Sequence, residues 1–311
     1  MHGHTDDSAS HDSASHDATS EPVYVASTDG VRVASYDFGG HGPLLVLCHA
    51  TGFCAGVWQP IARRLADRFH CVGLDFRGHG RTGRPDHAAL VWTGMGQDLL
   101  AVIDHALEQR GEAPGTPVFA AGHSMGGASI VLAELSRPGT IAKAWALEPI
   151  LFPTPDDVEL DKDMNPVHES PLVAGARRRR PEFESREAAF ERYASRPPFS
   201  EVDPEALRAY VDQGFRDLPG GGIRLRCEPE SEAEVFEHSL CGAYEHLAEI
   251  QFPFLVAASG DGEPPALITE DVVEQNPRFV RTEYTDLTHF APLEDPERMA
   301  HDIAAWFTTE S

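Results

Sequence analysis

The chain has 311 residues, of which 41% are hydrophobic and 24% charged, so collagen-like, coiled-coil and wholly disordered architectures are excluded. Aspartate and glutamate number 50 against 25 lysines and arginines, which gives a formal net charge of −25. A field of this sign repels phosphate backbones and anionic membrane surfaces, which argues against nucleic-acid and membrane partners.

Targeting and redox signals are absent from the sequence pattern. There is no run of about 18 apolar residues, and no basic start followed by an apolar core. The five cysteines form no CxxC pair, which is typical of a reducing compartment. We therefore expect a cytoplasmic protein. The first residues repeat the pentapeptide SASHD and contain nothing to bury, so residues 1–21 are predicted to be a disordered tail.

Strand and helix patterns alternate from residue 22 onward. Two valine-rich runs flank Asp29-Gly30 and predict a hairpin. Further strands are predicted at residues 44–48, 70–74, 117–121 and 141–147, with helices at 57–65, 97–107 and 128–135. This alternation predicts an α/β fold with a mostly parallel, doubly wound sheet.

The alternation stops after residue 151. Residues 152–251 show charged helical stretches, such as 184–194 and 204–215, and no convincing buried strand. Strand patterns return at 253–258 and 279–284, with helices from about residue 269 and at 296–307. We therefore predict a core formed by residues 22–151 and 252–311, into which residues 152–251 are inserted as a helical cap.

The segment Gly122-His123-Ser124-Met125-Gly126-Gly127 carries the clearest chemical signal. It follows an apolar strand and opens a helix, which is the context that gives a G-x-S-x-G motif its meaning. A serine on so sharp a turn needs strained backbone angles and small neighbours, and the helix start supplies free N–H groups for an oxyanion. Ser124 is therefore the candidate nucleophile.

Four segments together resemble the α/β-hydrolase superfamily, in its cap-bearing, esterase- or lipase-like serine hydrolase branch. They are LCHATGF from Leu47, DFRGHGRT from Asp75, GHSMGG from Gly122 and LTHFAPLE from Leu287. The resemblance implies the α/β-hydrolase fold, with about eight strands and an inserted cap, and a catalytic triad without a cofactor or metal. It is specific for the fold and the reaction type, and weak for the substrate.

Chain order in that superfamily implies that His289 is the catalytic base, because it follows the nucleophile and the last predicted strand. The triad acid is open between two strand ends. Glu148 follows the strand at 141–147, whereas Asp261 and Glu263 follow the strand at 253–258. We favour Glu148, since a carboxylate in an apolar run needs a partner such as an imidazolium. Asp261 is the first alternative and Glu263 the second.

The resemblance places the oxyanion donors at the N–H groups of Thr51 and Met125, although Ala50 replaces the usual glycine of the early loop. His49 and His79 lie in loops that shape the backbone, and His123 is the variable residue of the motif. The basic run Arg177–Arg180 is interpreted as a solvated or salt-bridged helix edge in preference to an anion site.

These residues predict a serine hydrolase that cleaves a carboxylic ester, or a related acyl bond, of a small and largely apolar molecule. The same residues allow carbon–carbon bond hydrolysis as an alternative. A non-catalytic ligand-binding protein that retains the triad is a third hypothesis, which reaction of Ser124 with a fluorophosphonate probe would test.

Overall fold

The computed structural model describes residues 21–154 and 170–309 of the chain. The predicted tail, apart from Glu21, and part of the predicted cap insertion lie outside the described residues. Within the described ranges, no helix combines the length and the apolarity that crossing a membrane requires.

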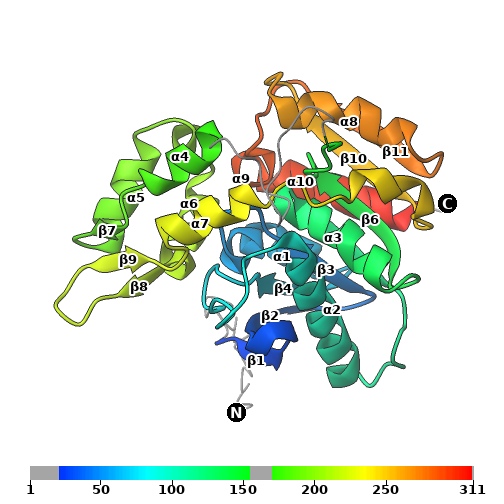
Figure 1. The fold of residues 1–311 in the computed structure, drawn as a ribbon, viewed down its shortest axis with the longest axis horizontal. Coiled ribbons are helices and arrows are strands. Elements are labelled where there is room, and N and C mark those ends of the chain that lie inside the picture. Colours follow the sequence, from blue (N-terminus) through cyan, green and yellow to red (C-terminus); the bar gives the residue numbers. More distant parts are fainter. Residues whose placement is uncertain (1–20, 155–169, 310–311) are drawn as a thin grey trace, which may run out of the picture.

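The core is one eight-stranded sheet whose strands follow the order β1-β2-β4-β3-β5-β6-β10-β11 (Figure 1). Strands β1 and β2 form the predicted hairpin, β2 pairs antiparallel with β4, and all remaining neighbours are parallel. The strands are β1 (Val23–Ala26), β2 (Arg32–Gly40), β3 (Leu44–Cys48), β4 (His70–Asp75), β5 (Val118–His123), β6 (Ile141–Leu147), β10 (Phe254–Ser259) and β11 (Phe279–Tyr284).

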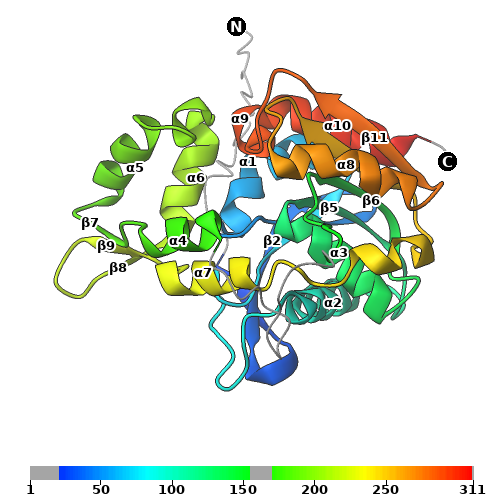
Figure 2. The ribbon, with the colours of Figure 1, turned by 45° about the horizontal axis from the view of Figure 1, so that its top comes forward.

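Helices cover both faces of this sheet and create two apolar layers. The helices of the core are α1 (Gln59–Leu65), α2 (Trp92–Gln109), α3 (Met125–Ser136), α8 (Pro264–Glu274), α9 (Ala291–Glu294) and α10 (Pro296–Thr308). In Figure 2, α1 and α10 lie on one side of the strands, and α2 and α3 on the other. All five residues of β3 are buried, which explains their continuous apolar run.

The inserted segment stands beside the core, at the left of Figure 1. Its helices are α4 (Pro171–Arg177), α5 (Arg186–Ala194), α6 (Pro204–Gly214) and α7 (Pro229–Glu237). A small antiparallel sheet of β7 (Glu182–Phe183), β9 (Ile223–Leu225) and β8 (Phe215–Asp217) accompanies them. The sequence predicted only helices here, because strands of two or three residues are too short to show an alternating pattern.

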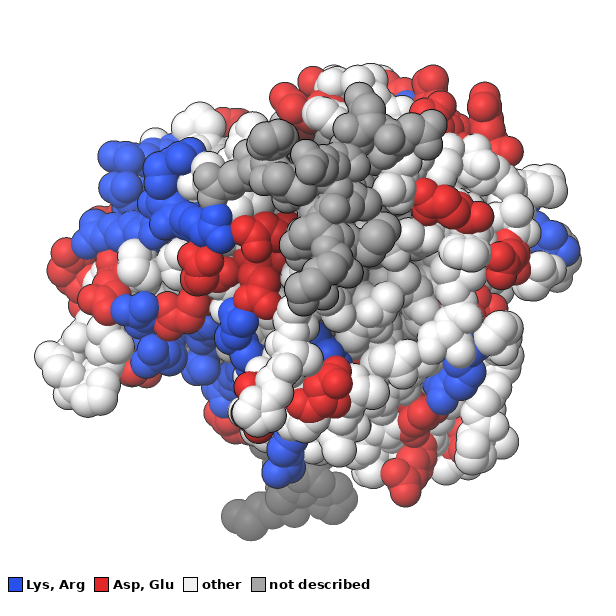
Figure 3. Space-filling model, viewed as in Figure 1, with Lys and Arg blue, Asp and Glu red and all other residues white. Residues whose placement is uncertain are grey.

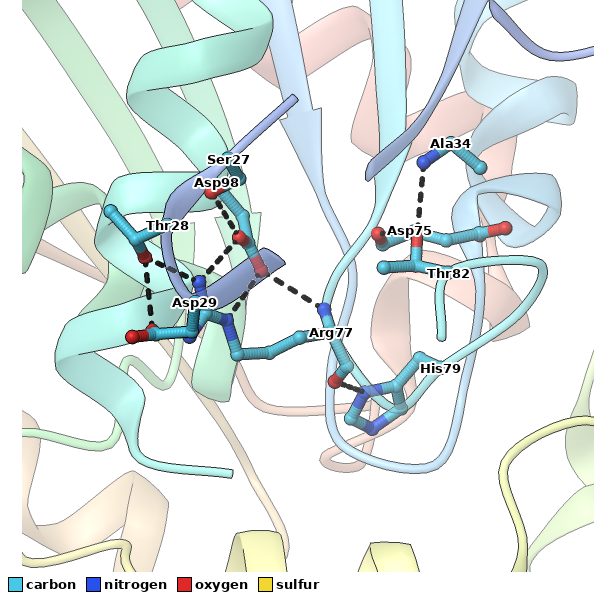
Figure 4. Close-up of polar contacts among 9 residues, drawn as sticks. All are labelled: Ser27, Thr28, Asp29, Ala34, Asp75, Arg77, His79, Thr82 and Asp98. Carbon is cyan, nitrogen blue, oxygen red and sulfur yellow. Dashed lines mark hydrogen bonds and ion pairs between the residues drawn. The ribbon is translucent and has the colours of Figure 1, made fainter. Parts of the chain in front are cut away.

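The turn after β4 is fixed by buried ionic contacts (Figure 4). Arg77 donates from Nη2 to Oδ1 of Asp98 at 2.8 Å and from Nε to Oδ2 at 3.0 Å, and both side chains are fully buried. Arg77 also donates to Asp29 at 2.9 Å. Thr82 donates to the carbonyl of Asp75 at 2.6 Å. The residues of this motif therefore hold the backbone, and none of them lines the cavity described below.

Replacing Asp98 with Asn should destabilise the protein by about 3 kcal/mol, because it leaves the buried guanidinium of Arg77 short of charge compensation. Urea denaturation gives the free energy of unfolding that tests this. The control is Asp104→Asn, since its ion pair with Arg137 is partly exposed and should contribute less than about 1 kcal/mol. Equal losses in the two variants would contradict the structural role of the Arg77–Asp98 pair.

Candidate active site

Ser124 occupies the tight turn between β5 and α3. Its backbone angles, φ 54° and ψ −117°, lie outside the regions that non-glycine residues normally adopt. The turn is held from both sides, since the N–H of Ser124 donates to the carbonyl of Leu147 at 2.9 Å and its own carbonyl accepts from the N–H of Gly127 at 3.0 Å. This strain points the serine into the cavity at the end of the strand.

The glycines beside Ser124 are required by close packing of backbones. A Cβ atom on Gly126 would lie 2.2 Å from the carbonyl oxygen of Cys48, and one on Gly122 would lie 2.7 Å from the nitrogen of Gly127. Both contacts are with main chain that cannot move aside. The G-x-S-x-G pattern thus reflects the approach of α3 to the end of β3.

His289 lies in the loop after β11, and its imidazole meets the end of β6. Its Nδ1 lies 2.5 Å from Oε2 of Glu148. The other oxygen of this carboxylate accepts the N–H of Ser259 at 2.6 Å, and the Glu148 side chain is fully buried. Glu148 itself has a φ of 43°, a second strained position, which turns its carboxylate toward the histidine.

Asp261 contacts the same histidine in another way. One oxygen accepts the backbone N–H of His289 at 2.9 Å, and the other accepts the N–H of Glu263 at 3.0 Å. Burial raises the pKa of Asp261, but these N–H donors outweigh it and leave the pKa below its ordinary value. Glu263 is exposed and precedes α8. Glu148 therefore contacts the imidazole ring of His289, whereas Asp261 accepts the backbone N–H of this residue. Glu263 forms no hydrogen bond with His289.

Two backbone N–H groups are candidate oxyanion donors: that of Met125, which follows Ser124 in the chain, and that of Thr51, which lines the same cavity as Ser124. Met125 is the first residue of α3, and the N–H of Thr51 lies in the loop after β3. Neither N–H donates a hydrogen bond to any residue in the described part of the chain. An unpaired N–H at a helix start is a ready donor to a developing oxyanion, so this is the arrangement that acyl transfer requires.

A cavity of about 960 Å³ brings these parts together. Ser124, His289 and Thr51 line it from the core, and residues of α4, α5 and α6 line it from the inserted segment. Much of its wall is aromatic, from Phe53, Trp92, Phe152, Phe183, Tyr193, Phe199, Tyr210, Phe236 and Phe290. Among the described residues, no group of three or more His, Cys, Asp or Glu side chains is placed to hold a metal ion.

Three further histidines are buried near the site. Burial lowers the pKa of His79 to about 4, and it holds the pKa values of His49 and His123 well below their ordinary range. His49 bridges two loops, with Nδ1 2.8 Å from the carbonyl of Ala50 and Nε2 accepting the N–H of Phe76 at 3.1 Å. The ring of His123 lies 4.8 Å from that of His289. The low pKa of His123 keeps the imidazole next to His289 neutral.

The low pKa of His79 makes stability depend on pH. Below the ordinary value of 6.5 the unfolded chain binds a proton that the folded chain refuses, so the free energy of unfolding falls as pH falls toward 4. One such histidine contributes about 1.4 kcal/mol per pH unit in that window. Urea midpoints at pH 7 and pH 5 should differ less in His79→Gln than in the wild type. The exposed His301→Gln should leave the difference unchanged, and an equal pH dependence in all three proteins would contradict this account.

The sequence model of the alpha/beta hydrolase family matches residues 45–302. With the fold described above, this match means that the chain belongs to the alpha/beta hydrolase family. An E-2-(acetamidomethylene)succinate hydrolase of known crystal structure superimposes with a TM-score of 0.72 at 19% identity, covering 93% of this chain and 100% of that one. At that identity the likeness concerns the fold alone.

Curated relatives match over shorter segments. A Mycobacterium tuberculosis protein named "Probable oxidoreductase EphD" is 33% identical over 134 residues, which are 42% of this chain and 22% of that protein. Human monoglyceride lipase is 29% identical over 117 residues, which are 36% of this chain and 37% of the lipase. The matches thus cover well under two thirds of these relatives.

Proposed function

We propose that this protein is a serine hydrolase that cleaves a carboxylic ester, or a related acyl bond, of a small molecule without a cofactor. One observation carries the proposal: Ser124 sits on a strained strand-to-helix turn in a cavity that it shares with His289, and the imidazole of His289 contacts the buried carboxylate of Glu148. A nucleophile, a base and an acid that orients the base are the parts that acyl transfer by serine needs.

The proposed reaction has two halves. His289 takes the proton of Ser124 as the hydroxyl oxygen bonds to the acyl carbon, and the N–H groups of Thr51 and Met125 hold the oxyanion. Collapse of that intermediate expels the alcohol, which takes the proton from His289. Water then attacks the acyl enzyme by the same route, giving the acid and free serine. Glu148 stabilises the imidazolium in both halves and fixes its tautomer.

The names of the relatives support cleavage of an acyl bond, but they include more than one type of acyl bond. A monoglyceride, in the name of the human lipase, is an ester, whereas the acetamidomethylene succinate in the name of the structural neighbour carries an amide. The mycobacterial name indicates redox chemistry, for which the described site offers no specific feature. We favour the ester because the proposed triad suffices for it. We also propose a cytoplasmic location, since the five cysteines are free and four of them are buried.

A fluorophosphonate probe and a series of p-nitrophenyl esters test the proposal together. We expect the probe to form one adduct that mass spectrometry places on Ser124, and we expect ester turnover with an initial burst of nitrophenol. A protein that binds esters without an adduct or turnover would be a non-catalytic binding protein. Cleavage without any adduct on Ser124 would contradict the proposed nucleophile.

A further inference from the structure

The cavity of this acidic protein has a cationic wall. Its described lining includes five arginines against two glutamates: Arg178, Arg179, Arg180, Arg192 and Arg196 against Glu232 and Glu263. The whole chain has a net charge of −25, so this local excess is opposite in sign to the protein's average. On the face drawn in Figure 3, blue side chains gather over the region of α4 and α5.

Two of these arginines are satisfied by the protein itself. Arg179 forms an ion pair with Glu232, and its Nη2 donates to the hydroxyl of Tyr210 at 2.7 Å. Arg180 forms an ion pair with Glu184 at 3.0 Å and stacks on the ring of Phe183. These contacts connect elements of the inserted segment, so neither arginine is free to neutralise a ligand.

The other three arginines of the cavity wall have no such partner within the described residues. The side chains of Arg178, Arg192 and Arg196 make no hydrogen bond or ion pair with any residue in ranges 21–154 and 170–309. Arg192 lies in α5 and Arg196 follows its end, so in sequence they bracket Tyr193, whose hydroxyl lies 3.3 Å from Nη2 of Arg179. A guanidinium that faces a largely aromatic cavity without a carboxylate partner favours an anion there.

An apolar path separates this wall from the catalytic residues. A series of neighbouring rings connects the two. The ring centroids of His289 and Phe290 are 6.2 Å apart, those of Phe290 and Phe199 5.5 Å, and those of Phe199 and Tyr193 4.7 Å. A molecule that spans the path needs an apolar body of several carbon atoms, with its reacting carbonyl at Ser124 and its charge at the arginines.

We propose that the substrate carries a carboxylate, and that Arg178, Arg192 and Arg196 bind this group while an apolar chain leads to the scissile ester. The inference rests on the proposed function, since it concerns the substrate of the same serine. It goes beyond the expectation that the arginine run is a solvated or salt-bridged helix edge. Arg177, with its ion pairs to Glu230 and Glu237, fits that expectation, whereas Arg178 faces the cavity.

Half-esters of dicarboxylic acids test directly whether a carboxylate on the substrate is recognised. Monoethyl and diethyl adipate share one acyl chain and one leaving group, and only the monoethyl ester carries a free carboxylate. We expect kcat/KM to be at least about tenfold higher for the monoethyl ester. Arg192→Gln and Arg196→Gln should each lower kcat/KM for the monoethyl ester about tenfold, mainly through KM. Both should change the value for the diethyl ester less than about twofold. Adipate should likewise slow probe labelling of Ser124.

Arg186→Gln is the matched control, because Arg186 lies on the same helix as Arg192 but pairs with Asp217 away from the cavity. It should leave the preference for the half-ester intact. Equal or better cleavage of the diethyl ester, with Ser124 still labelled by the probe, would overturn the anionic substrate alone. An unlabelled Ser124 with neither ester cleaved would overturn the proposed function. A half-ester preference that survives in both cavity variants would show that these arginines do not bind the carboxylate.

Discussion

Ser124→Ala should abolish covalent labelling by a fluorophosphonate and lower kcat for ester hydrolysis on the order of 10⁴- to 10⁶-fold. The hydroxyl oxygen is the atom that would bond to the acyl carbon, and no water in its place can be activated equally well by His289. What activity remains would come from the oxyanion donors and from substrate binding. The measurement is single-turnover and steady-state hydrolysis of the best p-nitrophenyl ester.

A second serine nearby provides the control for this substitution. Ser129 is buried on α3 and donates to the carbonyl of Met125 at 2.9 Å, so it resembles Ser124 in size and burial but does not line the cavity. Ser129→Ala should keep labelling and most of kcat. Thermal unfolding of both variants shows whether the fold is retained. A Ser124→Ala enzyme that keeps more than about a tenth of wild-type activity would rule out the proposed nucleophile.

Strand β3 could be predicted from sequence because burial on both faces requires a continuous apolar run. The run at β3 and the pattern at β11, Phe279–Tyr284, match the observed strands end to end. Helix starts were less accurate. We expected a helix from about Thr269, but α8 begins at Pro264. A proline at the first helical position is itself a start signal, since it lacks only an N–H that would be unpaired there anyway.

The inserted segment was harder to predict, for a physical reason. Its small sheet is made of strands two and three residues long, and its helices α4 and α7 bury few apolar residues that could set a helical period. Arg179 and Glu232 meet although 53 residues separate them, and nothing local marks either as half of a buried pair. Such pairings depend on the tertiary arrangement alone.

The residues of the candidate site also differ in how far sequence could predict them. Ser124 could be proposed from a local motif, because the strained turn demands glycines at fixed positions around it. The acid could be proposed only as a preference for Glu148 over Asp261 and Glu263, since both β6 and β10 end near the loop of His289 and each is followed by a carboxylate there. Only the packing of the two parallel strands, which hydrogen-bonds Glu148 to Ala257 and Ser259, shows which carboxylate reaches the imidazole.

Glu148→Gln should lower kcat about 10²-fold or more while keeping the side-chain volume. The amide oxygen can still accept the N–H of Ser259, and this contact turns the amide NH₂ toward Nδ1 of His289. Nδ1 would then accept a hydrogen bond and Nε2 would carry the proton. A protonated Nε2 cannot take the proton of Ser124, and the imidazolium also loses its counter-charge. Ester hydrolysis measured near neutral pH tests this directly.

Asp261→Asn is the matched comparison, because Asp261 holds the backbone of the same histidine and not its ring. Asparagine keeps one oxygen for the N–H groups of His289 and Glu263, so the loop should shift slightly and kcat should fall less than about tenfold. A large loss in Asp261→Asn with a near-normal Glu148→Gln would move the triad acid to the end of β10 and leave Glu148 a structural role. Comparable intermediate losses in both, with a double variant no worse than either, would mean that the two carboxylates act as one unit on the imidazolium. The expected pattern is a severe loss for Glu148 and a mild one for Asp261, because only Glu148 contacts the nitrogen whose proton fixes the tautomer.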